Sequence, residues 1–131
     1  MNNAIVIIPT YQERENIRDI IDAVFALPKD FHILVVDDNS PDGTGKIVEN
    51  LQQHFNTTET KLHLLTRPKK LGLGTAYIDG FHFALDRNYE FILGYQKGGG
   101  ILLANDSLDI TQQILEGLNK KYEAESGVKV K

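Results

Sequence analysis

The sequence contains no cysteine and no excess of positive charge. Without cysteine the chain can form neither a disulfide framework nor a thiolate metal site, and it has no thiol nucleophile. Its formal net charge is −4, with 14 Lys+Arg against 18 Asp+Glu, whereas nucleic-acid-binding domains are normally basic. The four histidines show no HxxxH or HExxH spacing. These absences argue against a disulfide-rich, a zinc-dependent or a nucleic-acid-binding protein.

Long hydrophobic runs are also lacking. No stretch approaches the roughly 20 apolar residues of a membrane-spanning helix, and the short run at residues 4–8 lacks the basic start of a signal peptide. The 131 residues, 41% hydrophobic and 24% charged, are typical of one ordinary globular domain. We therefore expect a soluble, cytoplasmic protein without a transmembrane segment, although a membrane lipid could still be its substrate.

Short apolar runs and amphipathic stretches alternate along the first two thirds of the chain. The runs predict four strands, at residues 4–8, 33–36, 62–65 and 89–93. Helical spacing of apolar residues predicts three helices between them, with stripes within residues 17–27, 47–55 and 77–85. Thr10 can cap the first helix, with Glu13 as its capping-box partner. This alternation is the signature of a parallel sheet with right-handed crossovers.

The pattern changes after Leu93. Residues 94–100 read as a glycine-rich turn and residues 101–104 as another strand, so a hairpin with an antiparallel fifth strand is expected. Asp106 or Ser107 can cap a final helix with the apolar face Ile110, Ile114, Leu115 and Leu118. Because the fifth strand then ends at the sheet edge opposite Asp38, we expect Asp106 to cap this helix and to bind no metal.

Two acidic residues, Asp37 and Asp38, directly follow the apolar run 33–36. In open α/β sheets ligands bind outside the carboxyl ends of the strands. Because Tyr11 and Glu13 follow the first strand at the same edge, an aromatic ring and three carboxylates are expected around one crevice. Such a set suits a nucleoside, which offers a ring for stacking and N–H and hydroxyl donors. Helix capping by Glu13 and ordinary loop polarity of the aspartates are the alternatives.

A second candidate segment is Leu71-Gly72-Leu73-Gly74-Thr75, at the start of the third predicted helix. Its backbone amides could meet a phosphate. It is neither a P-loop nor a dinucleotide fingerprint, because the required Lys-Ser/Thr or third glycine is missing. Arg67, Lys69 and Lys70 precede it and supply positive charge, but a solvated basic loop explains them equally well.

Three segments, in this order, resemble the family 2 glycosyltransferases and, within them, the dolichol-phosphate (polyprenyl-phosphate) mannosyltransferases. They are VIIPTYQERENI (6–17), VVDDNSPDGTG (35–45) and RPKKLGLGTAYIDGF (67–81). Over residues 1–93 the resemblance implies an α/β fold, a truncated GT-A (Rossmann-like) three-layer arrangement with a mostly parallel sheet, closed here by a C-terminal β-hairpin and helix. It also implies transfer of a sugar from a nucleotide-diphosphate donor, GDP-mannose, to a polyprenyl phosphate, in the intact family at the membrane surface.

Site residues follow from the resemblance by position. It implies that the donor nucleotide is held by Pro9, Tyr11, Glu13, Val36, Asp37 and Asp38, with a possible donor-site loop at Lys70, Gly72 and Gly74. The family uses Mg²⁺ or Mn²⁺, bound by an Asp-Ala-Asp motif at the end of the fourth strand. Here Leu93 is followed by Gly94-Tyr95-Gln96-Lys97, so the metal-binding acids are missing. The later segments that supply the catalytic and acceptor sites in the family are missing as well, which leaves the catalytic residues unknown, and we expect only nucleotide binding to be retained.

Residues 89–125 have a resemblance of their own, to the C-terminus of the OmpH/Skp periplasmic chaperones. Two regions are therefore expected. Residues 1–93 would be the nucleotide-sugar-binding half of a GT-A domain, and residues 94–131 an unrelated hairpin–helix tail packed on the same sheet. Such a chain would be a chimera joined near residues 89–93, and a non-enzymatic chimeric fragment is one alternative function.

Another alternative is a signalling receiver domain. Residues 33–39 resemble the acidic segment near the start of such domains. In such domains carboxylates bind magnesium next to a phosphoacceptor aspartate that ends a later strand. Asp79 falls instead in a helical pattern, and the expected late Lys-Pro is missing.

Overall fold

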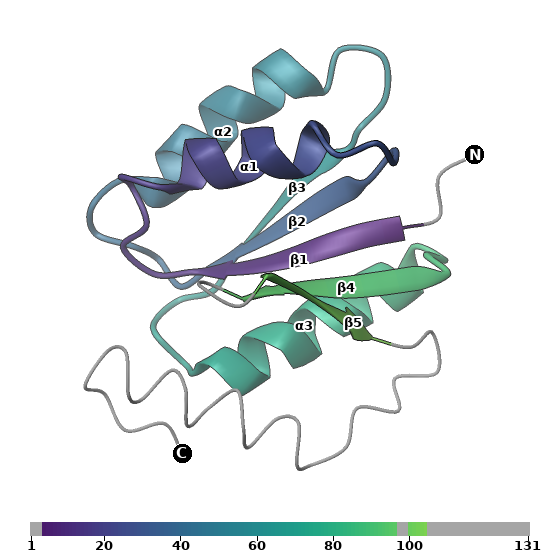
Figure 1. The fold of residues 1–131 in the computed structure, drawn as a ribbon. Coiled ribbons are helices and arrows are strands. Elements are labelled where there is room, and N and C mark those ends of the chain that lie inside the picture. Colours follow the sequence, from purple (N-terminus) through teal and green to yellow (C-terminus); the bar gives the residue numbers. More distant parts are fainter. Residues whose placement is uncertain (1–3, 97–99, 105–131) are drawn as a thin grey trace.

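The structure is a five-stranded sheet with helices on both faces (Figure 1). The computed structural model describes residues 4–96 and 100–104. In chain order the elements are β1 (Ala4–Thr10), α1 (Ile17–Phe25), β2 (His32–Asp37), α2 (Thr44–Phe55), β3 (Leu62–Thr66), α3 (Leu73–Asp86), β4 (Phe91–Gln96) and β5 (Gly100–Ala104).

The strand order is β3-β2-β1-β4-β5. The first four strands along the chain pair in parallel, and β5 pairs with β4 in the antiparallel sense. The parallel sheet and the antiparallel hairpin expected from the sequence are therefore confirmed. The chain winds outward from β1 to β3 and then returns to place β4 on the other side of β1. That reversal puts the topological switch point between β1 and β4.

The apolar runs of the sequence form the strands, and the central strands are buried on both faces of the sheet. A strand buried on both faces requires apolar residues at successive positions. One side of the sheet packs on α3, through Ile5, Ile7, Leu34, Val36 and Ile92. The other side packs on α1 and α2, through Val6, Ile8, Ile33 and Val35. Figure 1 shows the same division, with α1 and α2 on one side of the sheet and α3 on the other.

Two glycines bring α3 close to the sheet. A Cβ atom at Gly80 would lie 2.7 Å from Cγ2 of Ile7, and one at Gly94 would lie 2.6 Å from Cε1 of Tyr77. The Tyr77 hydroxyl donates a hydrogen bond to the carbonyl of Tyr95. Glycine at position 94 thus lets β4 lie directly against the Tyr77 ring, which a larger residue would displace.

Two expectations about element boundaries were wrong. Thr10 does not cap a helix: it is the last residue of β1, and α1 begins at Ile17 without a side-chain cap. The fourth strand runs over Phe91–Gln96 and not over 89–93, because Gly94 continues the ladder opposite Leu102. The glycine-rich stretch is therefore partly strand.

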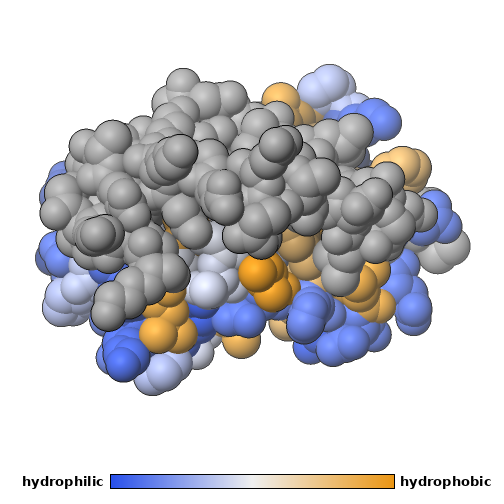
Figure 2. All heavy atoms as spheres, turned by 90° about the horizontal axis from the view of Figure 1, so that it is seen from below, coloured by the Kyte–Doolittle hydropathy of each residue, from blue (hydrophilic) through white to orange (hydrophobic). Residues whose placement is uncertain are grey.

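The expected final helix, including Asp106, lies outside the described residues, so its capping and the domain division at residue 93 stay predictions. Within the described ranges no helix is both long enough and apolar enough to cross a membrane. In the view from below in Figure 2, the hydrophobic residues that are coloured show as separate spots among hydrophilic ones.

Candidate functional site

The loops that follow β1 and β2 are tied together at the carboxyl edge of the sheet. The backbone N–H of Gln12 donates to Oγ of Ser40 (2.8 Å), and that of Glu13 donates to Oγ1 of Thr44 (3.1 Å). Gln12 and Asn39 adopt positive φ angles of 55° and 53°, which few non-glycine residues do. Hydroxyl groups of the second loop thus accept hydrogen bonds from backbone N–H groups of the first loop, which precede α1.

Asp42 anchors this junction. Its carboxylate accepts hydrogen bonds from the backbone N–H of Arg14 (3.1 Å), from the backbone N–H of Thr44 (3.0 Å) and from the Thr44 hydroxyl. Burial would raise the pKa of Asp42, but the hydrogen bonds from Thr44 and from backbone N–H groups lower it below its usual value. A carboxylate is therefore held ionised before the N-terminus of α2, where the helix dipole favours it.

Asp37 points into the protein. Only 2% of the residue is exposed, and its carboxylate accepts hydrogen bonds from the Thr10 hydroxyl (2.7 Å), the Ser40 hydroxyl (2.6 Å) and the Ser40 backbone N–H (3.0 Å). All three donors are neutral. Asp37 therefore joins the ends of β1 and β2 and shapes the turn that follows.

Asp38 is paired with Arg67, and both residues are buried. Nε of Arg67 lies 2.6 Å from Oδ1 of Asp38, and Nη2 lies 2.9 Å from Oδ2. The backbone N–H of Leu71 also reaches Oδ2, at 3.3 Å. This two-pronged geometry is the strong form of an arginine–carboxylate pair, and it engages both oxygens of Asp38.

The remaining donors of Arg67 bind α3 and the loop before it. Nη1 donates to Oγ1 of Thr75 (3.0 Å) and to Oδ2 of Asp79 (3.1 Å), and Nη2 donates to the carbonyl of Gly72 (3.1 Å). Burial would lower the pKa of Arg67, but the hydrogen bonds and charges of Asp38 and then of Asp79 raise it above its usual value. Arg67 therefore fixes the edge of the sheet to the start of α3.

Lys70 and Tyr11 form the more accessible part of this edge, since both are only half-buried. Nζ of Lys70 lies 4.9 Å from the centroid of the Tyr11 ring, within the range of a cation–π contact. Burial lowers the pKa of Lys70, and the charge of Asp38 opposes that shift. An ammonium group thus lies over an aromatic ring, close enough to Asp38 for that charge to act on it.

Four other residues expected at the donor site lie either in the strands or at the start of α3. Pro9 and Val36 are register partners in β1 and β2, and full burial of Val36 leaves only its backbone for a ligand. Gly72 precedes α3 with a φ of 106°, and Gly74 is buried in the first turn of that helix.

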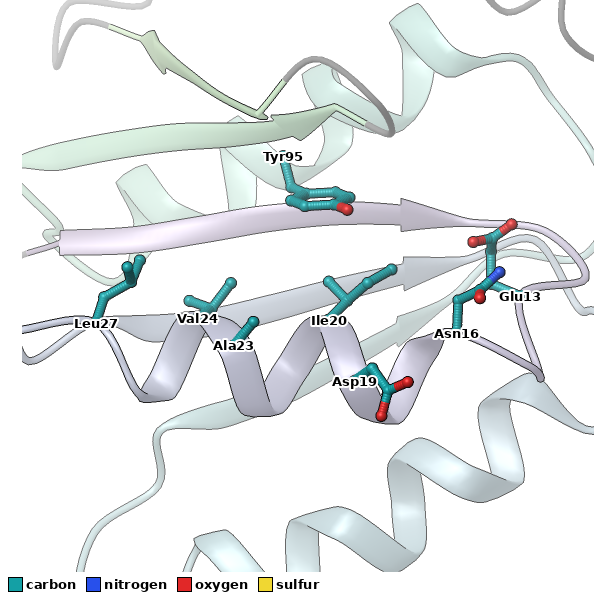
Figure 3. A pocket seen from close by; sticks show the side chains of 8 residues that line it. All are labelled: Glu13, Asn16, Asp19, Ile20, Ala23, Val24, Leu27 and Tyr95. Carbon is teal, nitrogen blue, oxygen red and sulfur yellow. The ribbon is translucent and has the colours of Figure 1, made fainter.

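Glu13 lines a groove along α1, which lies on the opposite face of the sheet from α3 (Figure 3). The expectation of three carboxylates around one crevice is therefore wrong, since Glu13 lines this groove and Asp37 and Asp38 do not. Asp37 and Asp38 are engaged by protein donors, and Glu13 lies on the α1 side.

Reasoning from the sequence missed the role of Arg67. A solvated basic loop describes the exposed Lys69, but only 4% of Arg67 is exposed. A signal for the pair was available, because Asp38 and Arg67 each directly follow one of two neighbouring parallel strands. Asp37 pairs in register with Thr66, which places the two following side chains at the same edge.

We tested whether the described residues fit the divalent cation that the resemblance implies. In the part of the chain that the structure describes, no three His, Cys, Asp or Glu side chains are grouped so as to hold a metal ion. Both oxygens of Asp38 face Arg67 and Leu71, and β4 ends in Gly94, Tyr95 and Gln96, which supply no carboxylate. These residues do not fit a divalent cation.

Comparison with known proteins identifies the family. The model of Glycosyl transferase family 2 matches residues 5–93, which is more than half of the chain. The chain belongs to this family. Membership removes the receiver-domain alternative, and Asp79, which lies in α3 and binds Arg67, does not stand where a phosphoacceptor would.

Two curated proteins are similar in sequence. Polyprenol monophosphomannose synthase of Mycolicibacterium smegmatis is 42% identical over 95 residues, which cover 72% of this chain and 35% of that protein. Undecaprenyl-phosphate mannosyltransferase of Micrococcus luteus is 36% identical over 95 residues, covering 72% of this chain and 37% of that protein. The chain thus spans about a third of the length of these relatives.

Solved structures show the same fold. Mannosyltransferase PcManGT from Pyrobaculum calidifontis, in complex with GDP-Man and Mn²⁺, has a TM-score of 0.60 at 26% identity, covering 70% of this chain and 26% of that one. S. aureus TarS has a TM-score of 0.53 at 29% identity, covering 72% and 16%. The mostly parallel α/β fold of the GT-A type expected for this chain is confirmed.

Proposed function

We propose that the described domain binds the nucleotide of a nucleotide-diphosphate sugar, GDP-mannose, as the donor-binding part of a polyprenyl-phosphate mannosyltransferase. Two relatives are named for mannosyl transfer to polyprenyl phosphates, and a solved structure of similar fold is a complex with GDP-Man. These proteins are much longer than this chain, so the acceptor lipid and the transfer step belong to the proposal as well.

The observation that carries the proposal is the contact of Lys70 with Tyr11, together with the effect of the Asp38 charge on Lys70. The Tyr11 ring offers a face on which a base or ribose can pack. The partly desolvated ammonium of Lys70 is placed to attract the diphosphate, because a charge interaction strengthens as the local dielectric falls. The backbone N–H of Leu71 on Asp38 fixes the loop that carries Lys70.

The division of labour between the charged residues follows from their burial. Arg67 has its donors committed to Asp38, Thr75, Asp79 and Gly72, so it acts as a positioning residue. It holds the edges of β2, β3 and α3 in one arrangement before the ligand arrives, which reduces the ordering cost of binding. Tyr11 and Lys70 make the contacts.

Isothermal titration calorimetry with GDP and GDP-mannose tests the proposal. We expect weak binding by the wild type and about tenfold weaker binding by Lys70→Met, since hydrogen bonds to charged groups contribute about 1.5–3 kcal/mol. Tyr11→Ala should weaken binding similarly. The matched control is Lys69→Met, which removes the same charge from an exposed neighbour and should change the affinity less than twofold.

The outcomes separate clearly. No measurable heat with the folded wild type, or equal losses for Lys69→Met and Lys70→Met, would contradict a nucleotide site at Tyr11 and Lys70. Asp38→Ala should also reduce binding, but it unpairs a buried arginine. Its affinity is therefore interpreted only alongside its unfolding curve.

We further propose that this chain alone does not transfer mannose. The described residues present no carboxylates suited to the cation that would stabilise a leaving diphosphate, a contribution of several kcal/mol. The assay is formation of radiolabelled polyprenyl-phosphate mannose in the presence of Mg²⁺ or Mn²⁺. Robust product from this chain would show the proposal to be wrong.

A further inference from the structure

A groove of about 440 Å³ runs between α1 and β4, on the face of the sheet opposite α3. Figure 3 shows Ile20, Val24 and Leu27 pointing from α1 toward the strands, with the Tyr95 ring facing them from β4. Ala23 lies between them along the helix. The groove is separate from the Asp38–Arg67 pair, which contacts α3.

The floor of the groove and its end at the amino edge of the sheet are formed by apolar side chains that are partly or largely exposed. Phe91, Leu93 and Tyr95 alternate along β4, so they share the face that the groove occupies. Leu93 and Tyr95 are only partly buried there, while Phe91 is 56% exposed and Leu27 is 40% exposed. Phe91 begins β4 and Leu27 follows α1, so both lie toward the amino edge of the sheet. This apolar surface has no described element packed over it.

We propose that this groove is the docking site of the chain's own C-terminal segment, residues 107–121. That segment carries Ile110, Ile114, Leu115 and Leu118 at helical spacing, and as a helix it would have one apolar face. A helix with such a face requires an apolar surface to pack against, and α1 and β4 provide one. The proposal is independent of nucleotide binding, because it uses the opposite face of the sheet.

The course of β5 brings the segment to the right end of the groove. Ala104, the last residue of β5, pairs with Ile92 near the start of β4, so the chain leaves the sheet at the amino edge. From there three peptide steps to Ser107 reach about 10 Å, roughly the spacing between packed layers. The segment therefore enters beside Phe91 and Leu27, the most exposed apolar residues of the surface.

Length and charge fit the same orientation. A helix over residues 107–121 is about 22 Å long, enough to follow the nine residues of α1 and the loop before it. Because α1 runs from the carboxyl edge to the amino edge, the docked helix would lie antiparallel to it. Lys121 would then arrive beside Asp19, an exposed acid in the first turn of α1 that lines the groove.

Disulfide trapping tests the proposal directly, because the chain has no cysteine of its own. Ala23→Cys combined with Ile114→Cys should form an intrachain disulfide on mild oxidation, detected by mass spectrometry and by faster migration on a non-reducing gel. The matched control combines Ala23→Cys with Glu116→Cys. Two residues further along a helix, position 116 turns about 200° away from the groove, so its disulfide should form at least tenfold more slowly.

Each outcome of the disulfide experiment either supports or overturns the docking proposal. Preferential intrachain bonding at position 114, independent of protein concentration, supports docking. An interchain disulfide would assign the groove to a second copy, and equal rates at 114 and 116, or no disulfide, would overturn the proposal.

Hydrogen exchange gives a second readout. Ala23→Asp should speed the exchange of amides in 107–121 about tenfold, while Ala26→Asp, at an exposed position that does not line the groove, should leave it unchanged. Equal exchange in both variants contradicts the proposal even if the disulfide forms.

Discussion

The two edges of the sheet keep buried polar side chains in opposite ways. At the carboxyl edge, Asp38 and Arg67 are both charged and pair with each other. The Gly72 carbonyl accepts a further hydrogen bond from Arg67, and the Leu71 backbone N–H donates one to Asp38. At the amino edge, the rings of His32 and His63 lie 6.4 Å apart, and Nε2 of each ring is buried without a hydrogen-bond partner. The carboxyl edge holds its charges by pairing them, whereas the amino edge keeps His63 uncharged.

At the amino edge, buried histidine nitrogens lack hydrogen-bond partners and the pKa of His63 is lowered. Nδ1 of His32 lies 2.6 Å from the Tyr89 hydroxyl, but its Nε2 is 3.9 Å from Glu59, too far for a hydrogen bond. Burial, with smaller effects from the positive charges of Arg87 and His32, lowers the pKa of His63 to about 4. His63 is thus kept neutral at physiological pH.

The difference teaches where a preorganised charge is useful. A ligand that brings phosphates and a base needs charges already fixed in place, which a paired set provides without rearrangement. A buried neutral imidazole offers no such field, and it makes stability depend on pH. The nucleotide binding that we propose therefore fits the carboxyl edge, whereas His63 packs as a neutral ring at the amino edge.

The largest effect should come from breaking the charged pair. Asp38→Ala leaves the Arg67 guanidinium buried with only Asp79 as a counter-charge, and we expect a loss of about 3–5 kcal/mol in the free energy of unfolding. Urea unfolding followed by circular dichroism measures it. Asp22→Ala, an exposed acid on α1, is the control and should cost less than about 0.5 kcal/mol. A small loss at Asp38 would mean that the pair is not the organising contact of this edge.

A smaller effect should separate the edges by pH. Because the pKa of His63 falls from 6.5 to about 4 on folding, the unfolded chain takes up the proton first as the pH drops. The stability is highest above pH 6.5 and falls between pH 6.5 and 4, by about 3 kcal/mol. Unfolding curves measured across this pH range give the free energy of unfolding at each pH. In His63→Leu that free energy should depend less on pH than in the wild type. An unchanged pH dependence in that variant would place the titration elsewhere.

The smallest expected difference compares two single hydroxyl deletions. Ser40→Ala removes one donor to Asp37, which keeps the Thr10 hydroxyl and the backbone N–H of residue 40. It also removes the acceptor of the Gln12 N–H, which is exposed, and we expect a loss of about 1 kcal/mol. Tyr89→Phe removes the hydrogen bond of His32, whose other nitrogen already lacks a partner, and should cost about 2 kcal/mol. Thermal unfolding at pH 7.5 ranks the two, and the reverse order would contradict the account of the amino edge.

Much of the fold could be read from the sequence because its signals are local. Period and run length predicted the alternating strands and helices, and the glycine turn predicted an antiparallel fifth strand. The predicted element boundaries were wrong where tertiary packing decided them. Gly94 was expected in a turn, but it continues β4, because the Tyr77 ring packs against the strand where only a residue without a side chain fits. Thr10 ends a strand because Asp37 accepts its hydroxyl, 27 residues away.

The candidate site divides in the same way. The sequence by itself determined the family, the sheet and the gathering of polar residues at its carboxyl edge, since the carboxyl ends of parallel strands share one edge. Only the tertiary structure decided that Asp38 faces Arg67, that Glu13 lies on the α1 side, and that Lys70 lies over Tyr11. Periodicity fixes which face of an element a residue occupies, whereas its partner depends on how separate elements pack. Asp38 and Arg67 stand 29 residues apart, and only the winding of β2, α2 and β3 brings them together.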